Sequence, residues 1–199
     1  MKKPISYFLG EGLLIVFSIL LALGVNEWRV RSGEAADERK AIADISAELI
    51  ENRELLEGIP AYHRDVSTAL SAAIEDVAPD DPRTPMEIFS ELDVLRGSII
   101  IDRLPQSVSW QLAKDRGIVG RFDYATAKAL ATTYDHQQAS VFDLYERVSE
   151  LMIRPEMFVA ENQAPTLQPL AVAFSELASR EQLLVKMQDK NIAALNGDG

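Results

Sequence analysis

The 199-residue chain contains no cysteine and only two histidines, His63 and His136. Without cysteine it forms no disulfide, and it offers no thiolate for catalysis or for binding zinc or an iron–sulfur cluster. The sequence also has no GxSxG motif, no glycine-rich phosphate-binding loop and no metal-ligand spacing. These absences predict a protein that is not an enzyme and that has no catalytic residues, no cofactor and no metal site.

Three short polar groupings are similar to catalytic or metal sites, but each lacks residues that such a site needs. Residues 63–65 (HRD) match the tripeptide of the protein-kinase catalytic loop, yet no asparagine follows at the required spacing. Asp135 and His136 are adjacent, and adjacent residues on a helix do not face one another. Asp80 and Asp81 lack the further patterned oxygens of a calcium loop. We therefore assign no chemistry to any of them.

Basic residues are scarce, with 20 Lys and Arg against 31 Asp and Glu, so the formal net charge is −11. A chain of this charge is repelled by nucleic-acid phosphates and, taken as a whole, by anionic lipid headgroups. Nucleic acid is thus excluded as an expected partner.

One long apolar run, residues 5–25, dominates the N-terminal part of the chain, and Glu11 is its single ionisable group. As a helix, 21 residues span about 32 Å, against a hydrocarbon core of about 30 Å. Trp28 and Arg29 follow the run and provide anchors at the headgroup level. We expect an N-terminal tail at 1–4, a transmembrane anchor at 5–28 and an acidic helical domain at 29–199.

A secretory signal peptide is the alternative reading of the same run, because residues 22–24 (ALG) form a passable cleavage site. The run is longer than a usual signal-peptide core, and the bulky Trp28 stands where a mature N-terminus is loose and polar. We therefore predict an uncleaved single-pass anchor in the bacterial inner (cytoplasmic) membrane. Lys2 and Lys3 in a four-residue tail favour an N-in orientation with the domain in the periplasm, although basic residues flank both ends almost equally.

Helical spacing places Glu11, Ser18, Ala22 and Asn26 along one stripe of the anchor. Small residues four positions apart permit close approach of a second helix, and the Glu11 carboxyl is able to hydrogen-bond across such a contact. The alternative is that Glu11 extends to the headgroups on the N-terminal side. Expected partners are membrane lipid and either other transmembrane helices or further copies of this chain.

The rest of the chain predicts an all-α fold, an antiparallel helical bundle that follows the transmembrane helix. Apolar residues recur at three, four and seven positions, while glycines and prolines separate the periodic segments. Residues 78–86 hold three prolines and two aspartates and are expected to form an exposed loop. Residues 98–104 are expected to be a buried extended connection or a helix. The expected helices cover residues 34–57, 61–77, 85–95, 107–116, 123–154 and 166–195.

Two stretches carry a family resemblance. One is the apolar run with its exit at residues 26–28 (NEW), and the other is residues 107–137, in which Trp110, Gly117, Tyr124 and Tyr134 recur at fixed spacing. Together they resemble bacterial single-pass membrane proteins grouped only as a domain of unknown function. The resemblance implies a membrane-bound helical protein and no particular activity.

The Trp110, Gly117, Tyr124 and Tyr134 set has a physical interpretation of its own as a packing motif. A buried Trp110 fills a large volume, and Gly117 adopts the left-handed conformation that ends a helix. A pocket for a ligand or partner is the alternative.

The sequence thus favours a membrane-anchored, non-catalytic accessory or scaffold subunit that docks on other membrane helices and presents an acidic helical bundle. The alternative is an extracytoplasmic ligand-sensing bundle that relays through the anchor, and an enzyme ranks third.

Overall fold

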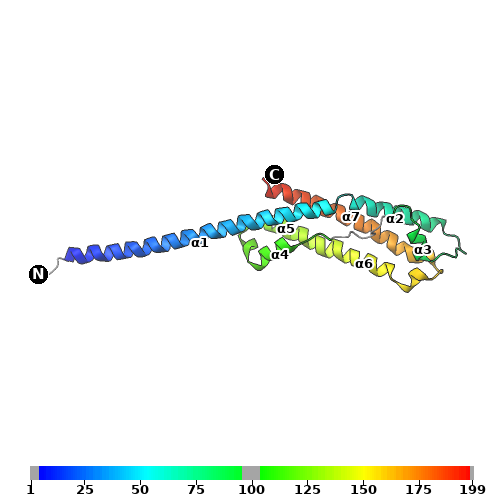
Figure 1. Cartoon of the computed structure of the whole chain (residues 1–199), viewed down its shortest axis with the longest axis horizontal. Coiled ribbons are helices and arrows are strands. Elements are labelled where there is room, and N and C mark those ends of the chain that lie inside the picture. The colour runs from blue at the N-terminus through cyan, green and yellow to red at the C-terminus, as the bar shows by residue number, and fades with distance from the viewer. Residues whose placement is uncertain (1–4, 96–103, 198–199) are drawn as a thin grey trace.

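The computed structural model describes the backbone of residues 5–95 and 104–197, with side chains from residue 13 onward. Within those ranges every regular element is a helix, as predicted, and there is no strand. Figure 1 shows a long N-terminal helix that projects from an elongated helical body. The elements are α1 (Ile5–Leu55), α2 (Ile59–Asp76), α3 (Pro85–Ser90), α4 (Val108–Asp115), η1 (Ile118–Arg121), α5 (Tyr124–His136), η2 (Gln137–Phe142), α6 (Asp143–Met152), η3 (Pro155–Phe158) and α7 (Gln163–Leu195).

Helix α1 is a single helix of 51 residues, about 76 Å long. The expected helix at 34–57 is continuous with the apolar run, since residues 32–33 (SG) do not interrupt α1 and one glycine costs a helix only about 1 kcal/mol. The described side chains from residue 13 to residue 37 are all exposed, and the body begins to cover α1 near Ala41. The apolar run and the body are therefore joined by continuous helix (Figure 1).

Gly58 separates α1 from α2, as the sequence predicted. Its φ of 75° lies in the left-handed region that glycine tolerates, and Pro60 follows within the first turn of α2. Helix α2 starts two residues earlier than expected.

Helix α7 lies along both halves of the body. Three contacts join it to α1 and α2: Arg53 to Asp189 at 3.1 Å, His63 to Glu181 at 2.8 Å, and Ser67 to the Ala171 carbonyl at 2.8 Å. Because rising residue numbers pair with falling ones, α7 runs in the opposite direction to α1 and α2, as Figure 1 also shows. It begins three residues before the predicted start, so Pro169 lies inside the helix.

The predicted helix 123–154 is present as α5 and α6 joined by η2, a π-helical turn. The Asp123 carboxylate caps α5 by accepting a hydrogen bond of 3.0 Å from the Thr126 amide. Helix α6 ends at Met152, before Pro155. A π-turn inserts one residue into a helix and shifts the faces on either side of it relative to one another.

Helix α3 is shorter than the predicted 85–95, since it ends at Ser90. Its start is fixed by a capping box in which the Thr84 hydroxyl accepts from the Glu87 amide at 3.2 Å and the Glu87 carboxylate accepts from the Thr84 amide at 2.7 Å. The expected connection at 98–104 lies outside the described residues, apart from its last position.

The core consists of two apolar clusters along the length of the body. One cluster packs α2 and α6 against α7, and the other packs residues 41–49 of α1 against α4, η1 and α5. Three buried amides, Asn52, Gln137 and Gln188, lie between the clusters, and we refer to them as the amide layer. Apolar residues of the two clusters flank each amide along the chain: Leu49 and Leu56, Tyr134 and Val141, and Ile192 and Leu184.

Candidate functional site

The largest exposed apolar surface lies on the projecting half of α1. Within the described residues α1 is the one helix long and apolar enough to cross a membrane, and none of its apolar stretch is covered by the rest of the chain. Large apolar side chains exposed to solvent at this density require an apolar partner or a lipid environment. This stretch is the first candidate for a functional surface.

The predicted helix-contact residues Ser18, Ala22 and Asn26 share one face of α1, where a shallow hollow is also lined by Arg29. The Ser18 hydroxyl donates to the Leu14 carbonyl at 2.8 Å, so it is satisfied within its own helix. The side chain of Glu11 lies outside the described residues.

The predicted interface anchors follow on the same helix. Trp28 is 68% exposed, and Arg29 is exposed beside it. Arg31, one turn after Glu27, forms an ion pair with it at 2.5 Å. Polar and aromatic groups thus begin where the apolar stretch ends, which is the arrangement typical of a helix leaving a bilayer.

Trp110 and Tyr134 of the expected packing motif meet in the core. Their rings are stacked with centroids 5.4 Å apart and planes within 3° of parallel. The Tyr134 hydroxyl donates to Glu48 at 2.7 Å, and the Ser109 amide donates to the second oxygen of the same carboxylate at 2.7 Å. Burial and the nearby Glu48 carboxylate raise the pKa of Tyr134, so its hydroxyl stays a donor.

Glu48 is a site residue that the sequence analysis missed. Helical periodicity placed it on the charged, solvent-facing side of its helix, but only 7% of it is exposed. Two hydrogen-bond donors from distant segments compensate for the burial of this carboxylate. They are the Ser109 amide of α4 and the Tyr134 hydroxyl of α5. The residues next to Glu48 in the sequence do not indicate these partners, because the partners lie 61 and 86 residues away.

Tyr124 was expected to belong to the packing motif with Trp110 and Tyr134, but it does not. It is 82% exposed, so it does not pack with Trp110 and Tyr134. Tyr124 is the first residue of α5, and the side chain of a first-turn residue at this end of the body has no neighbouring helix to cover it.

Gly117 has a φ of 69°, the left-handed conformation expected of it, and it separates α4 from η1. A Cβ added there meets no atom within 4 Å, so the cost of a side chain is backbone strain alone. Gly117→Ala should lower the free energy of unfolding by about 1 to 2 kcal/mol. Urea unfolding followed by circular dichroism measures this.

Gly120→Ala is the matched control for that substitution. Gly120 also has open space around its Cβ position but has no positive φ. Equal unfolding midpoints for the two variants would contradict the assignment of strain to Gly117.

A second buried carboxylate, Glu181 of α7, joins three helices. Its side chain accepts a hydrogen bond from the Tyr145 hydroxyl and lies 2.8 Å from His63 Nδ1, and both Glu181 and His63 have 0% exposure. Burial and the Glu181 carboxylate raise the pKa of Tyr145. The histidine of the HRD tripeptide is therefore a core residue that joins α2 to α7.

The amide layer lies between these two carboxylate sites. The Asn52 side chain exchanges two hydrogen bonds with the Gln106 backbone, at 2.6 and 2.7 Å, and Gln137 donates to the Gln106 carbonyl at 3.1 Å. Among the described groups, the Gln137 oxygen and both polar atoms of the Gln188 amide have no protein partner. A buried amide without partners is costly, so this layer adds less stability than an apolar layer of the same size would.

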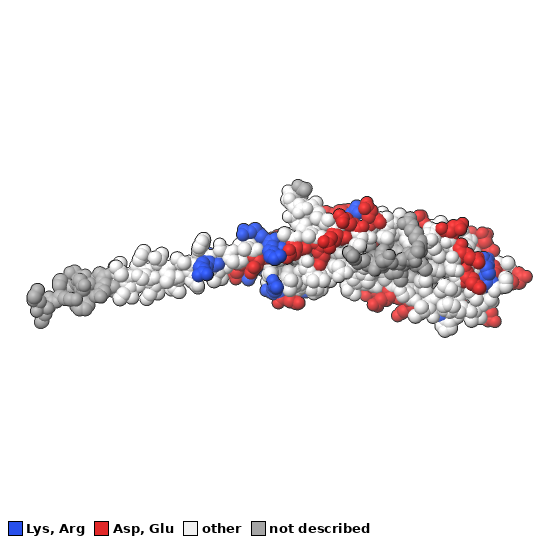
Figure 2. All heavy atoms as spheres, viewed as in Figure 1, with Lys and Arg blue, Asp and Glu red and all other residues white. Residues whose placement is uncertain are grey.

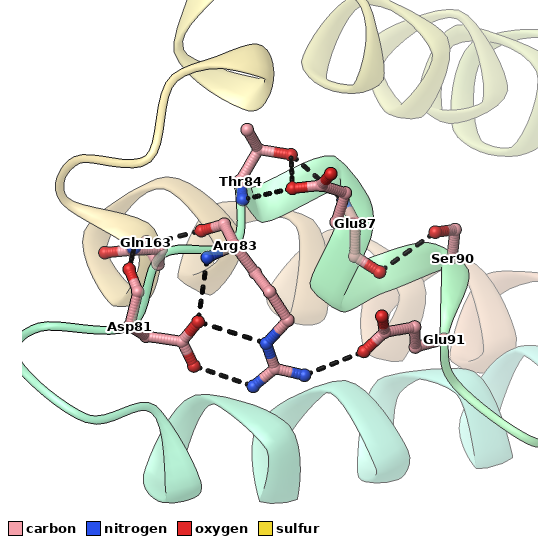
Figure 3. A network of polar contacts seen from close by, with 7 residues as sticks. All are labelled: Asp81, Arg83, Thr84, Glu87, Ser90, Glu91 and Gln163. Carbon is pink, nitrogen blue, oxygen red and sulfur yellow. Dashed lines mark hydrogen bonds and ion pairs between the residues drawn. The ribbon is translucent and has the colours of Figure 1, made fainter.

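The loop at 78–86 is anchored by a polar network (Figure 3). The Arg83 guanidinium holds the Asp81 carboxylate with bonds of 3.0 and 2.7 Å and reaches Glu91 at 2.7 Å. Gln163 of α7 donates to the backbone carbonyls of Asp81 and Arg83. The hydrogen bonds that the Arg83 side chain and backbone amide donate to the Asp81 carboxylate lower its pKa from 3.8 to about 2. The loop is exposed at residues 78–80, as expected of it, while its second half is partly covered and Pro85 is buried.

The Asp81 carboxylate is thus already paired with the Arg83 guanidinium. In the described part of the chain no three metal-ligating side chains gather at one point. No protein-family model, curated protein or solved structure matches the chain. The resemblance to single-pass proteins of unknown function therefore stays a prediction.

Proposed function

We propose that the protein is a membrane-anchored, non-catalytic accessory or scaffold subunit. The observation that carries this proposal is the projecting half of α1, whose apolar side chains are all exposed although the body behind them is well packed. A bilayer and neighbouring membrane helices supply the cover that the chain itself does not provide.

In this proposal α1 crosses the bacterial inner membrane once, with the N-terminus in the cytoplasm and the body, an antiparallel bundle, in the periplasm. The dibasic tail supports this orientation, since short basic segments resist translocation. The uninterrupted course of α1 into the body supports a scaffold, because a continuous helix holds the bundle at a fixed height and rotation above its membrane contacts.

The helix-contact face of Ser18, Ala22 and Asn26 is the proposed docking surface for a second transmembrane helix. Ser18→Leu with Ala22→Leu places larger side chains on this face, which should prevent the close approach of a second helix and convert an assembly into monomer. The mass of the protein–detergent particle, measured by light scattering after purification in mild detergent, reports this change.

Val16→Leu with Leu20→Phe provides the matched control, because these residues lie on the opposite face of α1. The control should keep the mass of the native protein. A native protein that is already monomeric and carries no further subunit would contradict the proposal.

One feature favours the alternative function, a ligand-sensing bundle. The amide layer places polar groups without protein partners beside the π-turn η2, and π-turns are frequent at functional sites. Scaffolding remains the better-supported function, because the unpaired amides are few and the described hollows lie on the surface.

A further inference from the structure

Charge is distributed unevenly along the body. Residues 26–44 and 107–128, at the end where α1 enters, carry 8 basic and 7 acidic side chains, and we call this region the anchor-side end. Residues 45–95 and 129–197 carry 8 basic and 21 acidic side chains. In Figure 2 the blue groups gather where α1 meets the body, while red groups spread over the remainder. The acidic excess of the chain therefore lies outside the anchor-side end.

The anchor-side end includes a small projection formed by α4 and η1. Lys114 and Arg116 are exposed on it, and neither forms an ion pair among the described groups. Arg121 of η1 forms an ion pair with Glu34 of α1 at 3.2 Å, which ties the projection to the helix that leaves the membrane. Two unpaired cations are thus held close to the exit of α1.

Exposed apolar and aromatic groups accompany these cations. Val108 and Leu112 of α4 lie one turn apart and are 64% and 45% exposed, and Tyr124 follows η1. Tyrosine is enriched at the headgroup level, where its ring is apolar and its hydroxyl is hydrated. The exposure of Tyr124, which packing does not explain, has a physical reason if this end faces lipid.

The height of the projection above the bilayer fits such a contact. The tip of the projection, where Arg121 contacts Glu34, lies eight residues beyond Asn26, which is about 12 Å of helix. Arg116 lines a hollow with Asp37, which lies eleven residues beyond Asn26, or about 16 Å. The headgroup region extends roughly 5 to 7 Å beyond the hydrocarbon core on each side. Lysine and arginine side chains extending from the projection cover the remaining gap.

We propose that the anchor-side end, through Lys114, Arg116 and Tyr124, docks on anionic lipid headgroups. This inference rests on the proposed function, because it requires α1 to span the bilayer. The acidic remainder of the body is repelled by the same lipids, so attraction at one end and repulsion at the other hold the long axis of the body away from the membrane surface.

The absence of cysteine gives this proposal a direct test. Tyr124→Cys, labelled with an environment-sensitive fluorophore, is reconstituted as the full chain in nanodiscs of phosphatidylcholine alone or mixed with phosphatidylglycerol. The mixed lipid should shift the emission to the blue, and high salt should reverse the shift. Lys114→Glu with Arg116→Glu in the labelled chain should lower the ratio of docked to undocked protein by more than about 25-fold, since each lost cation near an anionic surface contributes about 5-fold and each new glutamate adds repulsion.

Two controls define the outcomes. Arg147→Glu with Arg154→Glu makes the same change in net charge on the far part of the body and should leave the shift intact, and a label at Ile153→Cys should not respond to lipid. Emission at position 124 that is equal in both lipids, in chains that have entered the nanodiscs, would overturn the docking and leave the anchor standing. Failure to enter the nanodiscs would overturn both.

Discussion

Glu181→Ala should destabilise the body by about 3 to 5 kcal/mol, because it removes the buried acceptor that Tyr145 and His63 share. The tyrosine hydroxyl and the histidine Nδ1 lie in a fully buried site between α2, α6 and α7, where water does not replace the lost carboxylate. The loss also leaves a cavity beside the rings that surround His63, among them Phe174 at 5.7 Å between centroids. Urea unfolding of the detergent-solubilised chain, followed by circular dichroism, measures the change.

Glu176→Ala supplies the control on the same helix. Glu176 forms an exposed ion pair with Arg180 one turn away, and pairs of this kind contribute about 0.3 to 0.5 kcal/mol. Glu181→Gln keeps one side-chain oxygen as an acceptor and should fall between the two alanine variants. A Glu181→Ala midpoint no lower than that of Glu176→Ala would show that the buried carboxylate does not hold the three helices together.

Val16→Arg with Ile19→Arg should remove the protein from the membrane. Both side chains lie in the exposed apolar stretch of α1, and an arginine near the centre of a membrane-spanning helix costs roughly 2.5 to 3.5 kcal/mol. Two such residues disfavour insertion by about 10⁴-fold or more. Flotation of membranes in a density gradient after alkaline extraction should find the variant in the unbound fraction.

The control places the same charges elsewhere on the same helix. Ala35→Arg with Ala36→Arg lies beyond the apolar stretch, in a part of α1 that is exposed and helical. This variant should stay with the membranes. Flotation of the Val16 and Ile19 variant with the membranes would contradict the spanning role of α1.

Features that depend on neighbouring residues were predictable from the sequence. The apolar run, the left-handed glycines at 58 and 117, the Asp123 cap and the end of α6 before Pro155 each follow from residues within a few positions. Steric and hydrogen-bonding preferences of this kind act locally and leave a readable pattern.

Features that depend on distant residues were not predictable. Glu48 and Glu181 have the spacing of solvent-facing charges, and their burial depends on distant partners. These are Tyr134 and the Ser109 amide for Glu48, and Tyr145 and His63 for Glu181. Tyr124 has helical spacing that suits a core position, but it stands at an end of the body that no helix covers. The π-turn η2 was also not predicted, since residues 123–154 were expected to form one continuous helix.

The amide layer also affects how the body opens. With a polar layer that is only partly hydrogen-bonded between two apolar clusters, we expect two cooperative unfolding units, which amide hydrogen exchange would resolve as two protection levels. The unit built on residues 41–49 of α1 shares its helix with the projecting stretch, whereas the α2 unit is linked to it across Gly58. Opening of the α2 unit therefore leaves the helix of α1 intact, although α7 is shared by both units.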